Sequence, residues 1–430
     1  MPTCSTESDH MSAADQSRQK SNNTKFDVIV VGGGPAGASA ARRAAIAGAS
    51  VLLVDAATFP RSKPCGGAVS EQAMSYLGFP LGEQLIQAEV FGARVHFGPD
   101  TVESRKPFRI AVLTTRTELD AYLLEKAKDA GVTVVEGCRV KEVIQTLEDV
   151  TVFTADRKFT SKFLIAGDGA QSVIARTIRP SLAKSEFAVA YEGDISCSSA
   201  HPGILSGGLI DIFFGREYMG YSWIFPKRDH WNIGVGALAS EASNVKKSTL
   251  EFIENHRNLP HDTGAAIANG KGWTIPAGGY RRTVVKDRVF LIGDAAGFVD
   301  PFYGEGIAYA ILSGSKAGDL VGAASQRSTS EAAATCAREY ALFCRRQIDA
   351  DLRYGLLFAR LLHAWPSMLL KLFSTNAALV DKYLEVPAAR LTYRQYFRWF
   401  LPRAVVGVIS LSARDLLAWG RKAQPSPNSR

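Results

Sequence analysis

Residues 26–37 read FDVIVVGGGPAG, an apolar and partly β-branched run that ends abruptly in a glycine cluster. An alanine-rich stretch, 38–47, follows, and then a second apolar run over 50–54. The two apolar runs predict strands, and the alanine-rich stretch between them predicts a helix. Strand, glycine turn, helix and strand form one βαβ unit, so this segment predicts an α/β domain with a parallel sheet.

The spacing Gly32-x-Gly34-x-x-Gly37 lies between the first predicted strand and the helix, and Asp55 ends the second strand. In this fingerprint the first glycine permits a tight turn, the second admits a pyrophosphate, and the third lets helix and strand pack closely. The helix N-terminus adds N–H donors and partial positive charge, and the acid is placed to bind a ribose hydroxyl. The segment therefore predicts a dinucleotide site, without distinguishing NAD from FAD.

The 430-residue chain is 46% hydrophobic and 21% charged, which excludes disordered, collagen-like and disulfide-scaffold classes. Residues 331–430 contain 15 Lys/Arg and 7 Asp/Glu, while the first 330 residues hold 35 of each, so the formal surplus of +8 falls in the last hundred. Such a region favours an anionic partner, either membrane or nucleic acid, or else is a solvated face without a partner. No nucleic-acid-binding motif accompanies the charge, so nucleic acid is the less favoured partner.

The six cysteines form no CxxC pair and no metal-ligand pattern is evident, so no metal site is expected. Residues 1–25 are polar and contain no apolar segment of the signal-peptide kind, which predicts a disordered tail and a cytoplasmic location. The longest apolar run, 404–413, falls far short of the roughly 18 residues that a membrane-spanning helix needs. A transmembrane protein is not expected.

In the rest of the chain, segments with the two-residue hydrophobic period of a strand alternate with segments that have the roughly 3.6-residue period of a helix. Sheet is expected over 88–113 and 186–240, a helix over 117–130, a strand over 132–135, a strand over 284–292 and a helix over 306–320. From residue 330 onward the pattern is helical, with breaks expected at Pro366, Pro387 and Pro402.

Two more glycine clusters follow predicted strands, namely Gly167-Asp168-Gly169 and Gly293-Asp294. The second cluster leads to 301–306, which reads PFYGEG and opens the helix predicted at 306. A carboxylate at a strand end can hold a ribityl chain, and the dipole of the following helix favours the anionic edge of a reduced flavin. These features favour FAD as the dinucleotide.

In the order of its motifs the chain resembles FAD-dependent oxidoreductases of the para-hydroxybenzoate hydroxylase type, with Arg116-x-x-x-Asp120 lying between the first glycine motif and Asp168. Two further segments, KPCGG at 63–67 and YSWIFPK at 221–227, resemble the geranylgeranyl reductase family, flavoenzymes that saturate carbon–carbon double bonds of isoprenoid chains. The resemblance runs from about Phe26 to about Leu320, so it does not reach the C-terminal hundred residues.

The resemblance implies an α/β fold in which a Rossmann-like FAD-binding domain, 26–185 and 284–330, is interrupted by a mostly antiparallel β-sheet substrate domain, 186–283. A C-terminal helical region, 331–420, and disordered tails at 1–25 and 421–430 complete the expected organisation.

Carried over residue by residue, the resemblance also implies the cofactor contacts. They are Gly32, Gly34, Ala36, Gly37, Asp55, Cys65, Gly66, Arg116, Val140, Asp168, Asp294, Gly304, Gly306 and Ile307. Many family members have Glu at the ribose position where this chain has Asp55; the shorter acid preserves the role.

Cys65 follows a proline and precedes two glycines, so it lies on a turn where it either serves the flavin site, as a catalytic acid or by shaping the ring's surroundings, or merely packs. Tyr221 and Trp223 share one face of a predicted strand, and either line an apolar substrate tunnel or fill a core.

The implied function is reduction of an isoprenoid double bond by hydride from reduced FAD, with aromatic walls suited to a developing positive charge. Because the chain has no second GxGxxG, the electron donor is expected to be NADPH docking at the surface, a ferredoxin or a quinol. A flavin-dependent monooxygenase or halogenase of the same fold is the alternative, and a flavin-bearing lipid-binding protein without turnover is a third reading.

The C-terminal region also suggests peripheral contact with a membrane. Arg390, Arg394 and Arg398 recur every four residues, and an aromatic stripe of Tyr393, Phe397 and Phe400 lies beside them. Further basic and tryptophan residues extend the pattern: Trp399, Arg403, Arg414, Trp419, Arg421 and Lys422. The segment is either an interfacial helix or a lid packed on the flavoprotein core.

Overall fold

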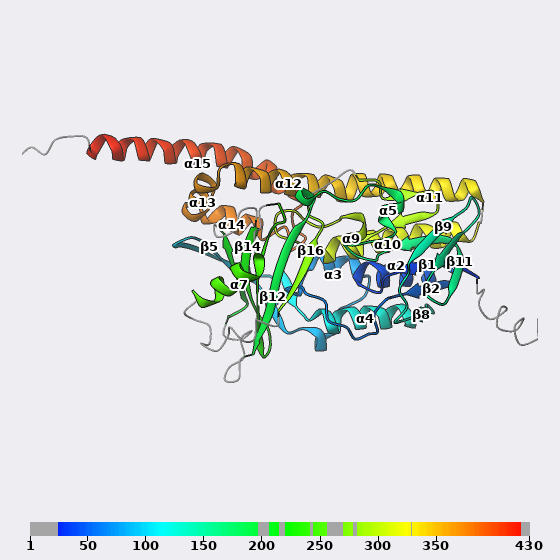
Figure 1. Cartoon of the computed structure of the whole chain (residues 1–430). Coiled ribbons are helices and arrows are strands. Elements are labelled where there is room, and N and C mark those ends of the chain that lie inside the picture. The colour runs from blue at the N-terminus through cyan, green and yellow to red at the C-terminus, as the bar shows by residue number, and fades with distance from the viewer. Residues whose placement is uncertain are drawn as a thin grey trace, which may run out of the picture.

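The computed structural model describes residues 25–196, 206–214, 220–240, 244–255, 270–277, 282–327 and 329–422, with side chains as far as Leu411. The chain forms a mixed α/β fold with a FAD-binding part built on one sheet, a second large sheet beside it, and a row of C-terminal helices along one side (Figure 1). The residues expected to form an N-terminal tail lie outside the described part of the chain, except that Lys25 begins the first strand.

The first sheet is built around β1 (Lys25–Val31), which pairs in parallel with β2 (Val51–Val54) on one side and with β11 (Lys158–Ala166) on the other. Its other strands are β8 (Thr133–Val135), β18 (Val289–Leu291), β17 (Val285–Lys286), β10 (Val150–Phe153) and β9 (Glu142–Gln145). The parallel strands read as almost uninterrupted apolar runs because helices cover both faces of such a sheet.

Two long helices pack tightly against each other over this sheet, namely α2 (Pro35–Ile46) and α10 (Ile307–Ser325). A stripe of small residues makes the close approach: a Cβ on Gly314 would lie 2.1 Å from the carbonyl oxygen of Ala36, and one on Gly318 would lie 2.3 Å from that of Ala40. The backbones therefore touch, and the start of α2 is held beside the middle of α10.

The second sheet has the strand order β16-β12-β15-β14-β13-β5-β6. Its strands are β16 (Lys271–Ile275), β12 (Ala188–Ser196), β15 (His230–Leu238), β14 (Gly220–Pro226), β13 (Leu209–Phe214), β5 (Gly92–Phe97) and β6 (Asp100–Arg105). All described pairings are antiparallel except β13 with β5. The sheet expected over 186–283 alone thus also takes in Gly92–Arg105, because β13 pairs with a strand from the first part of the chain.

The smaller elements connect these layers. A three-stranded sheet is formed by β3 (Ala68–Ser70), β7 (Ala111–Leu113) and β4 (Ala88–Val90). The shorter helices are α3 (Glu71–Leu77), α4 (Arg116–Asp129), α5 (Ala175–Ile178), α7 (Val245–Glu254) and α9 (Gly293–Ala296), with 3₁₀ turns at Glu83–Leu85 and Lys184–Glu186.

The C-terminal helices begin with α11 (Ser330–Phe343), which packs on the first sheet; the hydroxyl of Tyr340 donates to the carbonyl oxygen of Leu291 at 2.7 Å. A π-helical turn, Cys344–Ile348, leads into α12 (Asp349–Ala364), α13 (Pro366–Thr375), α14 (Ala377–Tyr383) and α15 (Tyr393–Lys422). Figure 1 shows α15 running past α13 and out beyond the body of the molecule.

Two elements of the structure differ from those expected from the sequence. The strand predicted over 284–292 is a tight hairpin of β17 and β18, because Asp287 adopts a left-handed conformation with φ of 51°. Pro402 does not break the last helix but lies inside α15. Buried side chains on either side of it, at Phe400 and Ala404, hold the helix against its neighbours, and this packing outweighs the missing backbone hydrogen bond.

No single helix in the described residues is long and apolar enough to cross a membrane. The bent pair Ser330–Ala364 and Pro366–Thr375 meets the length and composition criteria only jointly, across a 105° break.

Replacement of Gly37 by alanine is expected to destabilise the fold by about 3 kcal/mol or more, because the new Cβ would lie 1.7 Å from the carbonyl oxygen of Gly32. Gly48→Ala is the control: its left-handed φ of 90° costs about 1 kcal/mol, but no atom lies within 4 Å of the new Cβ. Equal midpoints for both variants in urea unfolding would contradict the close approach.

Candidate active site

The first glycine motif forms the turn between β1 and α2. Gly32 has a φ of 100°, and the helix begins at Pro35 with no side-chain cap, so its first N–H groups are open to a ligand. The carboxylate of Asp55 braces this turn by accepting from the backbone N–H of Gly33 at 2.6 Å and from that of Ala57 at 2.7 Å. Each of its oxygens keeps a second acceptor position, which a ribose hydroxyl can use.

A cavity of about 740 Å³ opens beside this turn. Eight of the residues expected to bind the cofactor line it: Gly32, Gly34, Ala36, Asp55, Arg116, Val140, Asp168 and Asp294. Gly37 lies behind it against the Gly32 carbonyl. The structure thus brings together segments from six places in the chain.

Asp168 supplies a test of what this cavity holds. Its Oδ2 accepts from the backbone N–H of Val173 at 3.0 Å, but its buried Oδ1 has no hydrogen-bond partner among the described residues. Burial raises the pKa of this carboxyl above its usual value. An unpartnered buried oxygen on a cavity wall fits a ligand with hydroxyl donors, such as the sugar chains of a dinucleotide.

Arg116 is fixed by Asp120 in a buried, two-point ion pair, with both N···O distances at 2.7 Å. Arg61 reaches the same carboxylate at 3.1 Å. The adjacent Asp120 carboxylate holds the pKa of the Arg116 guanidinium above its usual range despite burial. One carboxylate facing two arginines leaves excess positive charge beside the glycine turn, which suits a pyrophosphate.

A second cavity, of about 350 Å³, adjoins the first; Pro35, Lys63, Arg116, Trp273, Asp294 and Ala310 line both. Asp294 lies at the junction, where its Oδ2 is 3.3 Å from the Nζ of Lys63. The remaining predicted residues line the second cavity: Cys65, Gly66, Tyr221, Trp223, Gly304, Gly306 and Ile307. The cofactor contacts expected from the sequence therefore divide between a nucleotide chamber and a chamber facing the β-sheet part.

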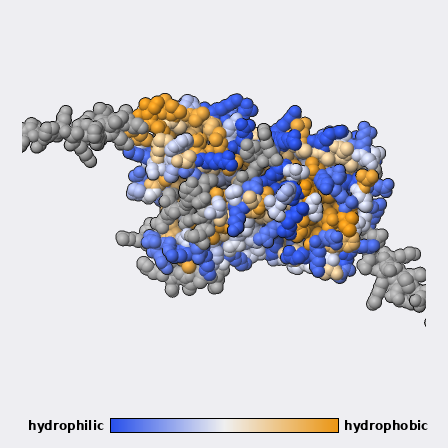
Figure 2. Space-filling view, turned by 45° about the horizontal axis from the view of Figure 1, so that its top comes forward, coloured by the Kyte–Doolittle hydropathy of each residue, from blue (hydrophilic) through white to orange (hydrophobic). Residues whose placement is uncertain are grey.

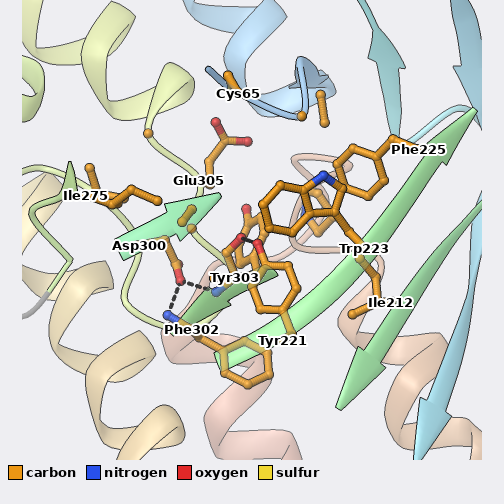
Figure 3. Close-up of a pocket in the computed structure, with 18 of the residues that line it drawn as sticks. Cys65, Ile212, Tyr221, Trp223, Phe225, Ile275, Asp300, Phe302, Tyr303 and Glu305 are labelled. Atoms are coloured by element: carbon orange, nitrogen blue, oxygen red, sulfur yellow. Dashed lines mark hydrogen bonds between the residues drawn. The ribbon is translucent and has the colours of Figure 1, made fainter. Parts of the chain in front are cut away.

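The walls of the second cavity are mostly apolar. Strand β14 contributes three aromatic rings in a row, Tyr221, Trp223 and Phe225, with successive centroids 5.9 and 6.3 Å apart (Figure 3). A Cβ on Gly66 would lie 2.7 Å from the Phe225 ring, so the turn that carries Cys65 lies directly on this row. Tyr221 and Trp223 thus face the cavity together, as the alternation along their strand predicts.

The polar tips of Tyr221 and Trp223 both have hydrogen-bond partners in the protein. The indole N–H of Trp223 donates to Asn232 at 2.8 Å, and the hydroxyl of Tyr221 donates to the backbone carbonyl oxygen of Tyr303. The rings therefore turn their apolar surfaces to the cavity.

The far end of the cavity is closed by the C-terminal helices. Its lining there consists of Phe358, Leu362, Phe373, Val380, Tyr383, Leu384 and Pro387. None of these carried a motif, because the aromatic periodicity of a helix gives the same signal in a core and in a ligand cavity.

Three buried carboxyl groups face this apolar space, and sequence analysis assigned none of them. Burial raises the pKa of Glu192 to about 7, that of Glu305 to about 7 and that of Asp300 to about 6. Glu305 accepts from the N–H of Ala308 at 3.0 Å at the start of α10, and Asp300 accepts from the N–H groups of Phe302 and Tyr303 (Figure 3). Glu192 and Glu305 are therefore about half protonated at pH 7, and Asp300 takes up its proton at a slightly lower pH.

Glu192 reaches the Cys65 turn from the other domain. Its Oε1 accepts from the backbone N–H of Cys65 at 2.5 Å, across 127 residues of sequence. Lys227 and Asp194 act on it electrostatically, the first lowering and the second raising its pKa. No local sequence signal identifies Glu192 as a site residue, because it is a single acid on a strand of alternating apolar and polar residues.

The donors and acceptors around both cavities fit FAD. The glycine turn and Arg116 would suit the pyrophosphate, Asp55 would suit the ribose, and Asp294 beside Lys63 would offer an acceptor to the ribityl hydroxyls. No group of His, Cys, Asp and Glu side chains able to hold a metal ion occurs in the described part of the chain.

Residues 25–331 match the family model described as FAD binding domain, and the C-terminal helices lie beyond it. Matching residues and a fitting cavity define a flavoprotein with FAD as its cofactor. Relatives include the menaquinone reductase of Mycobacterium tuberculosis, 34% identical over 317 residues that cover 69% of this chain and 76% of the relative. The chloroplastic geranylgeranyl diphosphate reductase of Nicotiana tabacum is 29% identical over 320 residues, 70% of this chain and 67% of the relative.

Solved structures share the fold. A geranylgeranyl bacteriochlorophyll reductase-like protein from Thermoplasma acidophilum superposes with a TM-score of 0.71 at 21% identity, covering 90% of this chain and all of that one. The flavin-dependent brominase Bmp2 superposes with a TM-score of 0.64 at 18% identity, covering 91% and 99%. The chain belongs to the geranylgeranyl reductase family of FAD-dependent oxidoreductases.

Replacement of Asp294 by alanine is expected to reduce bound FAD to less than a tenth of the wild-type amount, because Lys63 and the donors of the ribityl chain lose their acceptor. The measurement is flavin absorbance per chain after gel filtration. Asp319→Ala, which removes a half-exposed ion pair with Arg43, is the control and keeps its FAD. Undiminished flavin in D294A would overturn the assignment of this residue.

Proposed function

We propose that the protein reduces carbon–carbon double bonds in the isoprenoid chain of a lipid. The observation that carries this proposal is the apolar chamber that adjoins the nucleotide chamber at Lys63, Arg116 and Asp294. A chamber lined by aromatic and aliphatic side chains accepts a hydrocarbon chain and offers few partners to a polar substrate. The named substrates of the relatives, a menaquinone and a geranylgeranyl diphosphate, both carry prenyl chains, in agreement with this class.

Saturation of an alkene breaks one π bond and forms two C–H bonds, so the substrate must gain a hydride and a proton. Bound FAD in its reduced state supplies the hydride. Tyr221, Trp223 and Phe225 exclude water and turn ring faces to the chain, which stabilises positive charge that develops on the alkene carbon as it is protonated. The electrons come from NADPH docking at the surface, a ferredoxin or a quinol.

The proton, in this proposal, is held where Glu192 meets the Cys65 turn. Glu192 is buried beside the chamber and, with its raised pKa, is largely protonated below pH 7. The Cys65 thiol lies on the turn that Glu192 braces, and its Sγ is 3.4 Å from the backbone nitrogen of Gly67. Glu192 acts as the acid, and Cys65 shapes the approach of the alkene to the flavin site.

The direct test is anaerobic incubation of the chemically reduced protein with a polyprenyl lipid in detergent, followed by mass spectrometry. Products heavier by steps of about 2 Da are expected, at a yield limited by the bound flavin. A substrate that keeps its mass while the flavin stays reduced would contradict the proposal and favour a lipid-binding flavoprotein without turnover.

The shared fold of the brominase makes an oxygen-dependent reaction the alternative. The same incubation in air with bromide and a phenolic or pyrrolic acceptor separates the two. Halogenated or hydroxylated product that requires oxygen, without any reduction under anaerobic conditions, would favour the alternative.

Glu192→Gln is expected to slow reduction by about 100-fold and to remove the fall in rate that the wild type shows as pH rises through about 7, because glutamine keeps the acceptor for Cys65 but carries no acidic proton. Cys65→Ser is the matched comparison: it changes rate or product extent but keeps this pH dependence.

A second readout does not need turnover. The folded protein holds the Glu192 proton more tightly than the unfolded chain does, so this group stabilises the fold below its ordinary pKa of 4.5 and the contribution is lost as pH rises through about 7. Relative to E192Q, wild-type unfolding free energy should fall by roughly 3 kcal/mol across that interval. If the unfolding free energies of the wild type and E192Q change in parallel with pH, Glu192 has no raised pKa and is not the proton donor.

A further inference from the structure

The last described helix presents two different faces. The inner face of α15 carries the buried residues Tyr393, Tyr396, Phe400 and Ala404, which pack on α12, α13 and α14. The rings of Phe400 and Phe358 meet edge to face at 5.1 Å, and Phe358 in turn lines the apolar chamber. The aromatic stripe expected to meet a membrane is thus a core stripe for Tyr393 and Phe400, with Phe397 only partly buried. The first half of the helix packs behind the helices that line the substrate chamber.

The outer face is not covered by any of the described residues and divides into two zones. Arg394 and Arg398 are exposed on the first turns, and four exposed aliphatic side chains follow. These are Leu401, Val405, Val406 and Ile409, with exposed fractions of 45%, 53%, 64% and 63%. The positions 394, 398, 401, 405 and 409 are spaced by three or four residues, so they form one stripe along the helix. Arg390 lies before the helix instead, above the ring of Phe108 at 3.6 Å.

Such a surface is unusual for a protein that remains in water. Figure 2 shows apolar surface gathered where α15 leaves the body, with hydrophilic surface beside it. Exposed aliphatic residues that cluster along a stripe mark an interaction site, whereas single ones need no explanation. The helix is held from behind, because a Cβ on Gly407 would lie 2.4 Å from the Leu372 side chain of α13.

The charge around the stripe selects the partner. Residues 386–414 contain five arginines and no acidic residue. Arg403 adds an exposed guanidinium above the Trp399 ring, at 4.5 Å from its centroid. Aliphatic residues flanked by arginines and tryptophan match the boundary between the acyl chains and the anionic headgroups of a bilayer. The side chains of Arg414, Trp419, Arg421 and Lys422 lie outside the described residues.

We propose that the outer stripe of α15 docks the protein on an anionic lipid bilayer, with Leu401, Val405 and Ile409 in the acyl boundary and Arg394 and Arg398 at the headgroups. On its inner side the same helix supports the chamber wall, because Phe400 packs on Phe358 of α12, which lines the chamber. Docking therefore brings the end of the chamber lined by C-terminal helices to the bilayer surface, where a prenyl lipid resides. In this last respect the inference rests on the proposed function; the docking itself does not.

The test is co-sedimentation of the FAD-loaded full chain with phosphatidylcholine vesicles that contain or lack phosphatidylglycerol, at low and high salt. Binding is expected to require the anionic lipid and to weaken with salt. The variant Arg394→Gln/Arg398→Gln should bind about 30-fold more weakly, which corresponds to about 1 kcal/mol for each arginine near an anionic surface. At high salt the charge attraction is screened and only the apolar contact holds the wild type on the vesicle. Val405→Ser/Ile409→Ser should therefore abolish binding under that condition.

Two matched controls lie at the far end of the molecule. Ile144→Ser/Leu147→Ser removes exposed apolar residues, and Arg157→Gln/Lys158→Gln removes exposed charges; both should bind as the wild type does. Loss of binding in the controls to the same extent as in the α15 variants would overturn the proposal, because the attraction would then be unspecific.

A second copy of the chain is the competing occupant. Light scattering that gives a dimer for the wild type and a monomer for Val405→Ser/Ile409→Ser, with no vesicle binding by either, would replace the bilayer by a self-interface. If vesicle binding fails while detergent-dissolved lipid is still reduced, the docking surface falls and the proposed function stands. If vesicle binding holds while no lipid is reduced, the proposed function is wrong and the docking surface stands.

Discussion

Close contact between the backbones of α2 and α10 is the constraint on which the rest of the site depends. The two helices can touch because glycines on α10 meet alanines on α2, and the contact of Gly314 with Ala36 carries the start of α10 beyond the start of α2. The start of α2 then faces the nucleotide chamber, where its N–H groups and partial positive charge favour an anionic ligand, and the start of α10 lines the second chamber. Asp294 of α9, whose carboxylate lies near Gly306 at the start of α10, meets Lys63 where the nucleotide chamber joins the chamber of the β-sheet part.

The second chamber is a product of three separate parts of the chain. The FAD-binding part supplies the Cys65 turn, the large sheet supplies the aromatic row of β14, and the C-terminal helices close the end. Its apolar walls raise the pKa of the carboxyl groups buried beside it, since ionised forms lose their hydration there. The exclusion of water that suits a hydrocarbon substrate is thus also what keeps acids protonated near neutral pH.

The C-terminal helices illustrate how one segment serves two surfaces. Aromatic residues on the inner side of α15 pack in edge-to-face and stacked pairs with α12 and α13. This packing is dense enough to carry the helix past Pro402, where the local rule predicts a break. The outer side, free of that packing, keeps arginines and aliphatic residues exposed.

The sequence by itself determined the features that depend on local geometry. The FAD fingerprint with Asp55 and the common face of Tyr221 and Trp223 were predictable, because each rests on local spacing within one βαβ unit or one strand. Arg116 with Asp120 and the cofactor role of Asp294 were expected from the order of motifs that the chain shares with its family. Tertiary structure alone decided that Glu192 braces Cys65 across 127 residues, that β5 and β6 join the large sheet, and that Tyr393 and Phe400 face inward. An isolated acid or an aromatic stripe has the same pattern in a core as in a site, so only the packing of distant segments distinguishes the two.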